Sequence, residues 1–394
     1  MSSSTSANIT NLFVNLTFTS SNGMITLINN INGILNIFGY QILGNYVSTL
    51  TVAMIGININ TASITVNYIS FQPSTYNVGN CSSYLFGNAS STTNTFNINN
   101  VAVILGNSSN ILLLGSISTT SYDADFYLFG GLITYINSAS IINVSNIIVD
   151  SYQKFSSSYV SQSGFLVGYV KSSLSCVIVQ NVCLLQNMTS TTLKFQQFGL
   201  IGCNNGNSSI KDASVIFSVL ATYFWSLGII GAQQSLTLAD VMNLKTSVNF
   251  STISGGNIGS IIGAEYAKTC QIYNTTVYGF INSGQSSYIG GLIGVQYLNS
   301  NMTVQNTIVS QSNISGSGPV GGFAGNCLSS LRLINSKIQF VRISGFVSSV
   351  GIVVGINSNA IYSFSGSSST SNYINGVLQS DCGALSNNWS VAGC

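Results

Sequence analysis

The acidic side chains are the first candidates for chemistry in this sequence, because paired carboxylates transfer protons or bind calcium. Asp and Glu together number 7, and His is absent, which removes the commonest general base and the commonest transition-metal ligand. Only Asp123 and Asp125 are spaced so that a strand would place both on one face. This pair is the candidate for a catalytic dyad or a calcium site, and the alternative is two solvated carboxylates where the regular coils begin.

The 8 cysteines are the other candidate ligands or nucleophiles, and they lie at positions 81, 176, 183, 203, 270, 327, 382 and 394. They are too scattered for a disulfide scaffold, and the chain has neither a CxxC motif nor a His to complete a zinc site. We expect the internal ones to be buried free thiols. Cys382 and Cys394 bracket a short tail that one disulfide would close. No residue is assigned to a catalytic, cofactor or metal site.

The elements that must position these residues belong to a repeat. Its clearest copy is the Gly-rich apolar hexamer Ile289-Gly290-Gly291-Leu292-Ile293-Gly294. Copies recur at intervals of 29 to 34 residues, with the last hexamer position at Thr134, Gly168, Gly202, Gly231, Gly263, Gly294, Gly325 and Gly355. Self-similarity at such a period is typical of a solenoid.

A second register has the same period. In seven successive copies an Asn or Asp follows an aliphatic residue by two positions, 10 to 13 residues after the hexamer. The pairs are Val144/Asn146, Val179/Asn181, Ile210/Asp212, Val241/Asn243, Ile272/Asn274, Val304/Asn306 and Leu333/Asn335. The repeat therefore extends from Leu128 to Gly355, with earlier copies suspected around Gly56 and Gly106.

Residue preferences decide what the repeat folds into. Ile, Val, Ser, Thr, Asn, Gly and Tyr dominate, charged residues are 4% of the chain, and Gly, Asn and Ser interrupt short apolar runs. We therefore predict an all-β protein: a right-handed parallel β-helix (β-solenoid) with about 30–34 residues per coil. Three parts are expected: irregular N-terminal coils or a cap over residues 1–100, regular coils over 101–357, and a C-terminal cap over 358–394.

The Asn residues of the second register are expected at corners of the coils. Asn is the commonest non-Gly residue in the left-handed region, and its amide can hydrogen-bond to the Asn of the next coil. We therefore predict an Asn ladder, and the alternative is that these residues only form turns.

The two adjacent apolar residues of each hexamer raise a question about the surface. Neighbouring strand residues point to opposite faces, so Leu292 and Ile293 should not both enter the core. One row of such residues would then be covered by the N-terminal hundred residues or would serve lateral self-association.

Composition also excludes some partners. The net charge is +2, with no basic stripe for nucleic acid and no basic amphipathic helix for a membrane surface. Residues Val215 to Ala232 form an uncharged apolar stretch as long as a transmembrane helix. Gly228 and Gly231 within it follow the repeat register, so we predict a part of the solenoid there and no transmembrane span.

Gly290-Gly291-Leu292-Ile293-Gly294, followed by Asn306-Thr307 and Ile314-Ser315-Gly316, resembles the GLUG-type repeat of large bacterial adhesins and surface proteins. The resemblance covers residues 128 to 357 and departs at Thr134 and in the last coil, where Tyr362-Ser363-Phe364 replaces the expected aliphatic-x-Asn. It implies an extracellular or cell-surface protein with an adhesive or structural role, and it brings no catalytic residues. The Asn/Ser/Ile bias is similar to that of proteins from AT-rich protists such as diplomonads.

Three functions are compatible with this fold class. The first is a non-catalytic cell-surface or secreted repeat protein whose partner is an unknown surface ligand, protein or glycan. The second is a carbohydrate-active enzyme, a polysaccharide lyase or hydrolase, which would need clustered acidic residues such as Asp123 and Asp125. The third is an ice-binding face, which would need a Thr array in register, whereas the Thr-x-Thr triplets, for example Thr17-Phe18-Thr19, follow no common period.

Overall fold

The fold is taken from a computed structural model of the 394-residue chain. The structure describes residues 6–20, 26–48, 53–73, 75–77, 82–89, 93–105, 110–111, 128–155, 159–189, 194–234, 238–345, 349–357 and 362–379. Within these ranges the chain is all β and contains no α-helix, as predicted. It divides into two units: residues 1–195 with 200–207 form unit 1, and residues 196–199 with 208–394 form unit 2.

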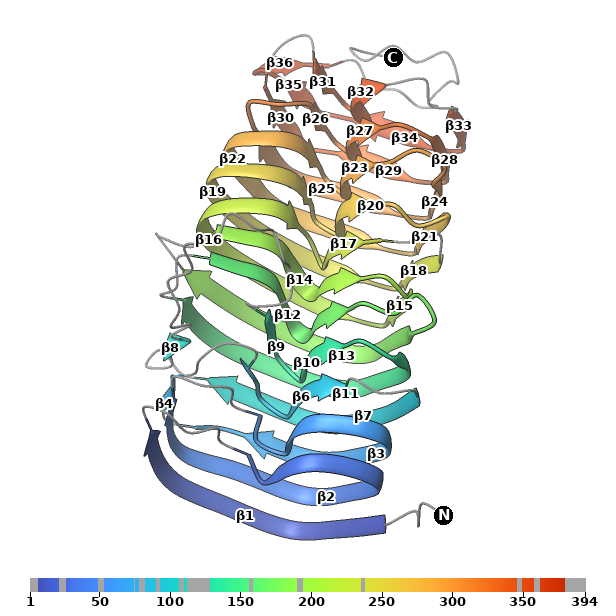
Figure 1. The fold of residues 1–394 in the computed structure, drawn as a ribbon. Helices are drawn as coiled ribbons and strands as arrows, with labels where there is room; N and C mark the ends of the chain where they lie inside the picture. The colour runs from blue at the N-terminus through green and yellow to red at the C-terminus, as the bar shows by residue number, and fades with distance from the viewer. Residues whose placement is uncertain are drawn as a thin grey trace, which may run out of the picture. The chain divides into compact units, whose positions relative to one another are not determined.

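Unit 1 consists of parallel strands of very different lengths (Figure 1, blue to green). They are β1 (Ser6–Ser20), β2 (Ile28–Ser48), β3 (Gly56–Phe71), β4 (Thr75–Asn77), β5 (Ser82–Ser83), β6 (Phe86–Ala89), β7 (Thr93–Leu105), β8 (Asn110–Ile111), β9 (Leu128–Gly130), β10 (Ile133–Ile136), β11 (Ala139–Phe155), β12 (Tyr159–Val170) and β13 (Cys176–Thr189). Strands β14 (Lys194–Asn204) and β15 (Asn207–Lys211) contain residues of both units.

Unit 2 contains the more regular coils (Figure 1, yellow to red). Its strands are β16 (Ser214–Leu227), β17 (Ile230–Gln233), β18 (Leu238–Met242), β19 (Lys245–Gly259), β20 (Ile262–Glu265), β21 (Thr269–Tyr273), β22 (Thr276–Gly290), β23 (Ile293–Gln296), β24 (Asn301–Gln305), β25 (Ile308–Ser315), β26 (Val320–Gly321), β27 (Ala324–Cys327), β28 (Ser330–Ile334), β29 (Lys337–Gln339), β30 (Arg342–Ser344), β31 (Val350–Gly351), β32 (Val354–Asn357), β33 (Tyr362–Ser365), β34 (Ser368–Thr370), β35 (Tyr373–Ile374) and β36 (Val377–Leu378).

The pairing register confirms the predicted solenoid in each unit. In unit 2, Ile230, Ile262, Ile293, Ala324 and Val354 pair successively in parallel, at intervals of 32, 31, 31 and 30 residues. In unit 1, Ala7, Leu35, Ile64, Phe96, Ile142 and Val177 do the same at intervals of 28, 29, 32, 46 and 35 residues. Each coil therefore lies on the next one, as in a parallel β-solenoid.

Parallel pairing begins well before the part of the chain in which the repeat was evident from the sequence. Strands β1, β2, β3 and β7 are paired along most of their lengths, from Ser6 onward. Strand β7 continues across residue 100, where a boundary was expected. At the other end, β35 and β36 form an antiparallel pair after the parallel coils. The three predicted parts, and the handedness of the helix, stay predictions.

The hexamers differ from the prediction in one respect, because both of their apolar residues are buried. Leu292 and Ile293 each have no exposed surface, and the same is true of Ile261 and Ile262. The expected alternation fails because the chain bends at Gly291 and Leu292, and the short strand begins only at Ile293. The prediction that one apolar row lies outside the core, where the N-terminal hundred residues would cover it or lateral association would use it, was therefore wrong about the position of the row, and self-association itself stays a prediction.

Glycine lets these short strands be buried on both faces. A Cβ added to Gly290 would lie 2.0 Å from the carbonyl oxygen of Ile293, and one added to Gly294 would lie 2.5 Å from the backbone nitrogen of Ile258. The end of one long strand thus packs backbone to backbone against the short strand that follows. Glycine is required at these positions because no side chain fits between the two backbones.

The apolar stretch from Val215 to Ala232 forms β16, a bend and the start of β17. Val215, Phe217 and Val219 are buried, and Ile216 and Leu220 between and beyond them are exposed, which is the alternation of a strand with one face on the core. No helix in the described ranges is long and apolar enough to cross a membrane.

Candidate surface site at the asparagine corner

One corner of every coil has a left-handed backbone, and this corner was predicted from the second register. Its residues have φ near +50°: Asn100, Asn146 and Asn181 in unit 1, and Asp212, Asn243, Asn274, Asn306 and Asn335 in unit 2. The aliphatic residue two positions earlier is buried in each of the predicted pairs. The hydrophobic core thus fixes the strand before the corner, and Asn or Asp provides the unusual φ.

Side-chain amides bridge successive corners, so the ladder is confirmed. In unit 1, Nδ2 of Asn181 donates to Oδ1 of Asn146 at 3.2 Å. Asn100 and Asn146 instead donate at 2.7 Å to Asn67 and Asn99, each the residue before the corner of the preceding coil. In unit 2, Asn243 donates to Asp212 at 2.8 Å, Asn274 to Asn243 at 3.3 Å and Asn306 to Asn274 at 3.1 Å.

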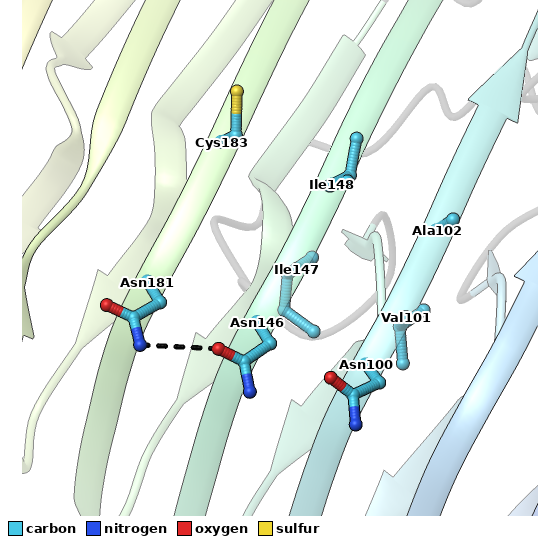
Figure 2. A pocket seen from close by; sticks show the side chains of 8 residues that line it. All are labelled: Asn100, Val101, Ala102, Asn146, Ile147, Ile148, Asn181 and Cys183. Carbon is cyan, nitrogen blue, oxygen red and sulfur yellow. Dashed lines mark hydrogen bonds between the residues drawn. The ribbon is translucent and has the colours of Figure 1, made fainter.

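The corner of unit 1 borders a shallow depression of about 430 Å³. Figure 2 shows two parallel rows of side chains across β7, β11 and β13: the amides of Asn100, Asn146 and Asn181, and beside them Ala102, Ile148 and Cys183. Ile147 and Val101 complete the lining between the rows. We call this depression the corner groove.

The corner groove combines apolar surface with unused hydrogen-bonding capacity. The Ile148 side chain is 55% exposed, although its neighbours in sequence, Ile147 and Val149, are buried. Each Asn amide has two N–H donors and two acceptor lone pairs, and the ladder takes one donor of each amide and one lone pair of Asn146. No charged side chain lines the groove, and the nearest carboxylate along β11 is the exposed Asp150. The site can therefore form hydrogen bonds and apolar contacts at once.

An exposed aromatic pair lies beside the corner groove. Tyr68 occupies the corner of the coil before Asn100, since its neighbours Asn67 and Ile69 pair with the neighbours of Asn100. Its φ is +58°, which is rare for a bulky residue, and its ring lies 5.0 Å from that of Phe38 in an edge-to-face arrangement. Both rings are about half exposed. The strained backbone thus holds an aromatic ring in solvent, at the end of the amide row.

A second group of polar residues is buried in unit 2. Gln233, Glu265 and Gln296 pair in successive short strands, and all three side chains are fully buried. Oε1 of Glu265 accepts a hydrogen bond from the backbone N–H of Ala267. Burial raises the pKa of Glu265 to about 8, and contacts with Ala267 and the Cys270 thiol oppose this only in part. Glu265 is therefore a neutral acid near pH 7 and resembles the Gln on either side of it.

The acidic pair identified in the sequence, Asp123 and Asp125, lies outside the described residues, so its role stays a prediction. Asp212 belongs to the ladder of unit 2, and Asp150 is exposed on β11. In the part of the chain that the structure describes, no three His, Cys, Asp or Glu side chains form a group that could hold a metal ion.

The internal cysteines agree in part with the prediction. Cys203, Cys270 and Cys327 are buried free thiols, Cys176 is partly exposed, and Cys183 is exposed in the corner groove. Burial raises the pKa of Cys203, and burial followed by the charge of Glu265 raises that of Cys270. Cys81 and the expected Cys382–Cys394 disulfide lie outside the described residues.

A signal for the aromatic pair is present in the sequence, as the column of corner residues. The corners Asn11, Gly39, Tyr68 and Asn100 all have positive φ, and they precede Asn146 in the same column. Because Gly39 and Tyr68 replace Asn, the pattern of an aliphatic residue two before Asn is missing from these two coils. Comparison with protein-family models, curated proteins and solved structures gives no match.

Proposed function

We propose that this protein is a non-catalytic repeat protein that adheres to a surface ligand, as a secreted or cell-surface component. The corner groove is the observation that carries this proposal. It presents three amides, an exposed aliphatic side chain and an adjacent aromatic pair on strands held rigidly by the solenoid. Aromatic and apolar side chains with a few polar groups are typical of binding surfaces.

The resemblance of the hexamers to GLUG-type repeats supports the same function. The repeat period and the parallel coils agree with such a repeat protein, and the adhesive role, the extracellular location and a protist origin belong to the proposal. A solenoid also suits this function mechanically, because each coil adds the same backbone and a new set of exposed side chains.

The proposal is tested with fluorescent beads coated with the purified protein. Beads are flowed over surfaces carrying cellulose, chitin, mannan, collagen or fibronectin, and the retained fraction is measured. We expect retention on at least one surface and weaker retention when the beads carry the Tyr68→Asn variant. Retention on none of them, together with release of reducing ends from one of the polysaccharides, would replace the adhesive function by the enzymatic alternative.

A further inference from the structure

We infer that the corner groove of unit 1 binds a neutral glycan, with a sugar ring on Tyr68 and Phe38 and sugar hydroxyls on the amides of Asn100, Asn146 and Asn181. This inference rests on the proposed function and assigns a ligand class to the same site.

The amides are the first reason. Nδ2 of Asn146 donates to Asn99 and its Oδ1 accepts from Asn181, which leaves one N–H and one lone pair on the same exposed amide. Asn100 and Asn181 have at least as much capacity left among the hydrogen bonds that the structure shows. A primary amide that both donates and accepts matches two adjacent hydroxyls of a sugar ring.

The aromatic pair is an independent second reason. Phe38 and Tyr68 expose about half of their ring surfaces, and the backbone of Tyr68 has a φ that costs about 1–3 kcal/mol for such a residue. Asn or Gly at this corner would avoid that cost, as Gly39 does one coil earlier. The Tyr68 ring is thus exposed to solvent even though its backbone conformation costs free energy. Its flat apolar face is the kind of surface on which the C–H groups of a sugar pack.

The spacing of the rows favours a glycan over a peptide. Successive coils bring equivalent side chains about 4.8 Å apart, whereas an extended peptide presents side chains on one face about every 6.8 Å. A peptide that crosses the coils therefore loses register after one or two contacts. A chain of sugar rings presents hydroxyls continuously along its sides, so it can meet every amide of the row.

The charges favour a neutral ligand. No charged residue occurs before Asp123 in the sequence, so the strands that carry Phe38, Tyr68 and Asn100 contain none. Asp150, the only acidic residue described in unit 1, lies on β11 two positions beyond Ile148 and would repel an anionic chain. Neither sulfated nor acidic glycans would find a cation among the groove residues.

The test uses variants whose structural effects are matched. Tyr68→Asn removes the ring and places at the corner the residue found in the next coils, so its melting temperature should rise. Phe340→Asn is its control, because Phe340 in unit 2 is also exposed at positive φ, +55°, but has no amide row beside it. Asn146→Gly keeps a backbone that allows positive φ and deletes the amide, and Asn274→Gly does the same on the ladder of unit 2.

Binding of cellohexaose, chitohexaose, mannohexaose and maltohexaose is measured by calorimetry, with oligogalacturonate as the anionic comparison. We expect at least one neutral oligosaccharide to bind, and Tyr68→Asn and Asn146→Gly each to weaken its binding roughly tenfold, the effect of one lost contact. Phe340→Asn and Asn274→Gly should leave the affinity unchanged. A gain in melting temperature with a loss of affinity in Tyr68→Asn separates a binding role from a structural one.

Three results would overturn the inference. The first is oligosaccharide binding that all four variants retain, because the site would then lie elsewhere. The second is tighter binding of oligogalacturonate than of every neutral chain. The third combines two observations: no neutral oligosaccharide binds, and bead retention is abolished when the surface is treated with protease but not when it is treated with periodate. The adhesive function would then hold, with a protein as the ligand. If the beads are retained nowhere and no oligosaccharide binds, both proposals fail.

Discussion

The same corner backbone carries different surfaces in the two units. In unit 1, the residues two positions after the corner are Ala102, Ile148 and Cys183. In unit 2, the equivalent residues are Ser214, Lys245, Thr276, Ile308 and Lys337. The fold restricts the residue type at the corner, because the backbone there requires positive φ. The residue two positions later is exposed or partly exposed, so the fold restricts its type less.

The two units also differ in what they bury. Unit 2 encloses the carboxyl group of Glu265, whereas the one acidic residue described in unit 1 is exposed on β11. Glu265 stays buried because a neutral carboxylic acid fits between Gln233 and Gln296. We therefore expect two solenoid units of similar architecture to respond differently to pH.

The largest effect is expected when a side chain is placed between the packed backbones. Gly294→Val in unit 2 and Gly202→Val in unit 1 put a Cβ within about 2.5 Å of backbone atoms that cannot yield. Each should destabilise its own unit by more than about 4 kcal/mol, because overpacking adds to the loss of strand pairing. Limited proteolysis with mass spectrometry should locate new cleavages in the altered unit. Cleavage spread equally over both units would show that the two unfold together.

The next effect concerns pH. The pKa of Glu265 is about 8 in the folded protein against an ordinary value of 4.5, so the folded state binds this proton more tightly. The stabilisation is fully present below about pH 4.5, decreases as the pH rises and is lost by about pH 8. Glu265→Gln should therefore stabilise unit 2 at pH 8 by about 2–4 kcal/mol and leave its stability at pH 4 unchanged.

Hydrogen exchange is measured on peptides from each unit at pH 4 and pH 8. Comparing Glu265→Gln with the parent at the same pH cancels the intrinsic pH dependence of the exchange. Unit 1 peptides should not respond. Gln296→Glu is the matched control and should introduce a second pH-dependent loss in unit 2. If Glu265→Gln protects unit 2 equally at pH 4 and pH 8, the carboxyl group does not titrate as described.

A smaller effect is expected at the ladder. Asn274→Ala removes two amide bridges, the one to Asn243 and the one from Asn306, and leaves an alanine with no side-chain hydrogen bond at φ of +48°. The cost should be about 1–2 kcal/mol, and Asn274→Gly should recover most of it because Gly adopts positive φ without strain. Chemical denaturation of both variants measures the difference. Equal losses in the two would mean that the amide bridges matter and the backbone does not.

The smallest effect tests whether the residue after the corner is free to change. Exchanging the two surfaces with Ile148→Lys and Lys337→Ile should alter the free energy of unfolding by less than about 0.5 kcal/mol in either unit. The melting temperature of each variant checks this. A large loss for Ile148→Lys would mean that Ile148 stabilises the fold, and the contrast between the units would then need another explanation.

Much of the fold could be predicted, because each coil of the solenoid requires the same residue types at the same positions and the sequence therefore repeats them. The buried aliphatic residue before the corner and the Asn at positive φ, such as Val304 and Asn306, appear in the sequence as a fixed pair. The burial of Leu292 together with Ile293 could not be predicted from strand alternation, which holds only for straight strands. The bend between them depends on backbone packing at Gly290 and Gly294.

The candidate site was less accessible to prediction. Ala102, Ile148 and Cys183 lie at intervals of 46 and 35 residues in the sequence, and an insertion in the longer coil hides their common register. Tyr68 belongs to no sequence motif, and it can be recognised as a corner residue only from its place in the column of corners. A surface made from one residue per coil cannot be found by reading residues that are near each other in the chain.

At each corner the Asn provides the positive φ, and the residue two positions later contributes to the surface. These separate roles affect how such a protein can evolve. Duplication of one coil adds an amide to the ladder and a rung to the groove without disturbing the coils beside it, because each coil contacts only its neighbours. A point mutation two positions after the new Asn then changes the chemistry of that rung alone. On the proposed function, the number of coils would set the length of the binding site and single exposed residues would set its chemistry, so the two properties could change separately.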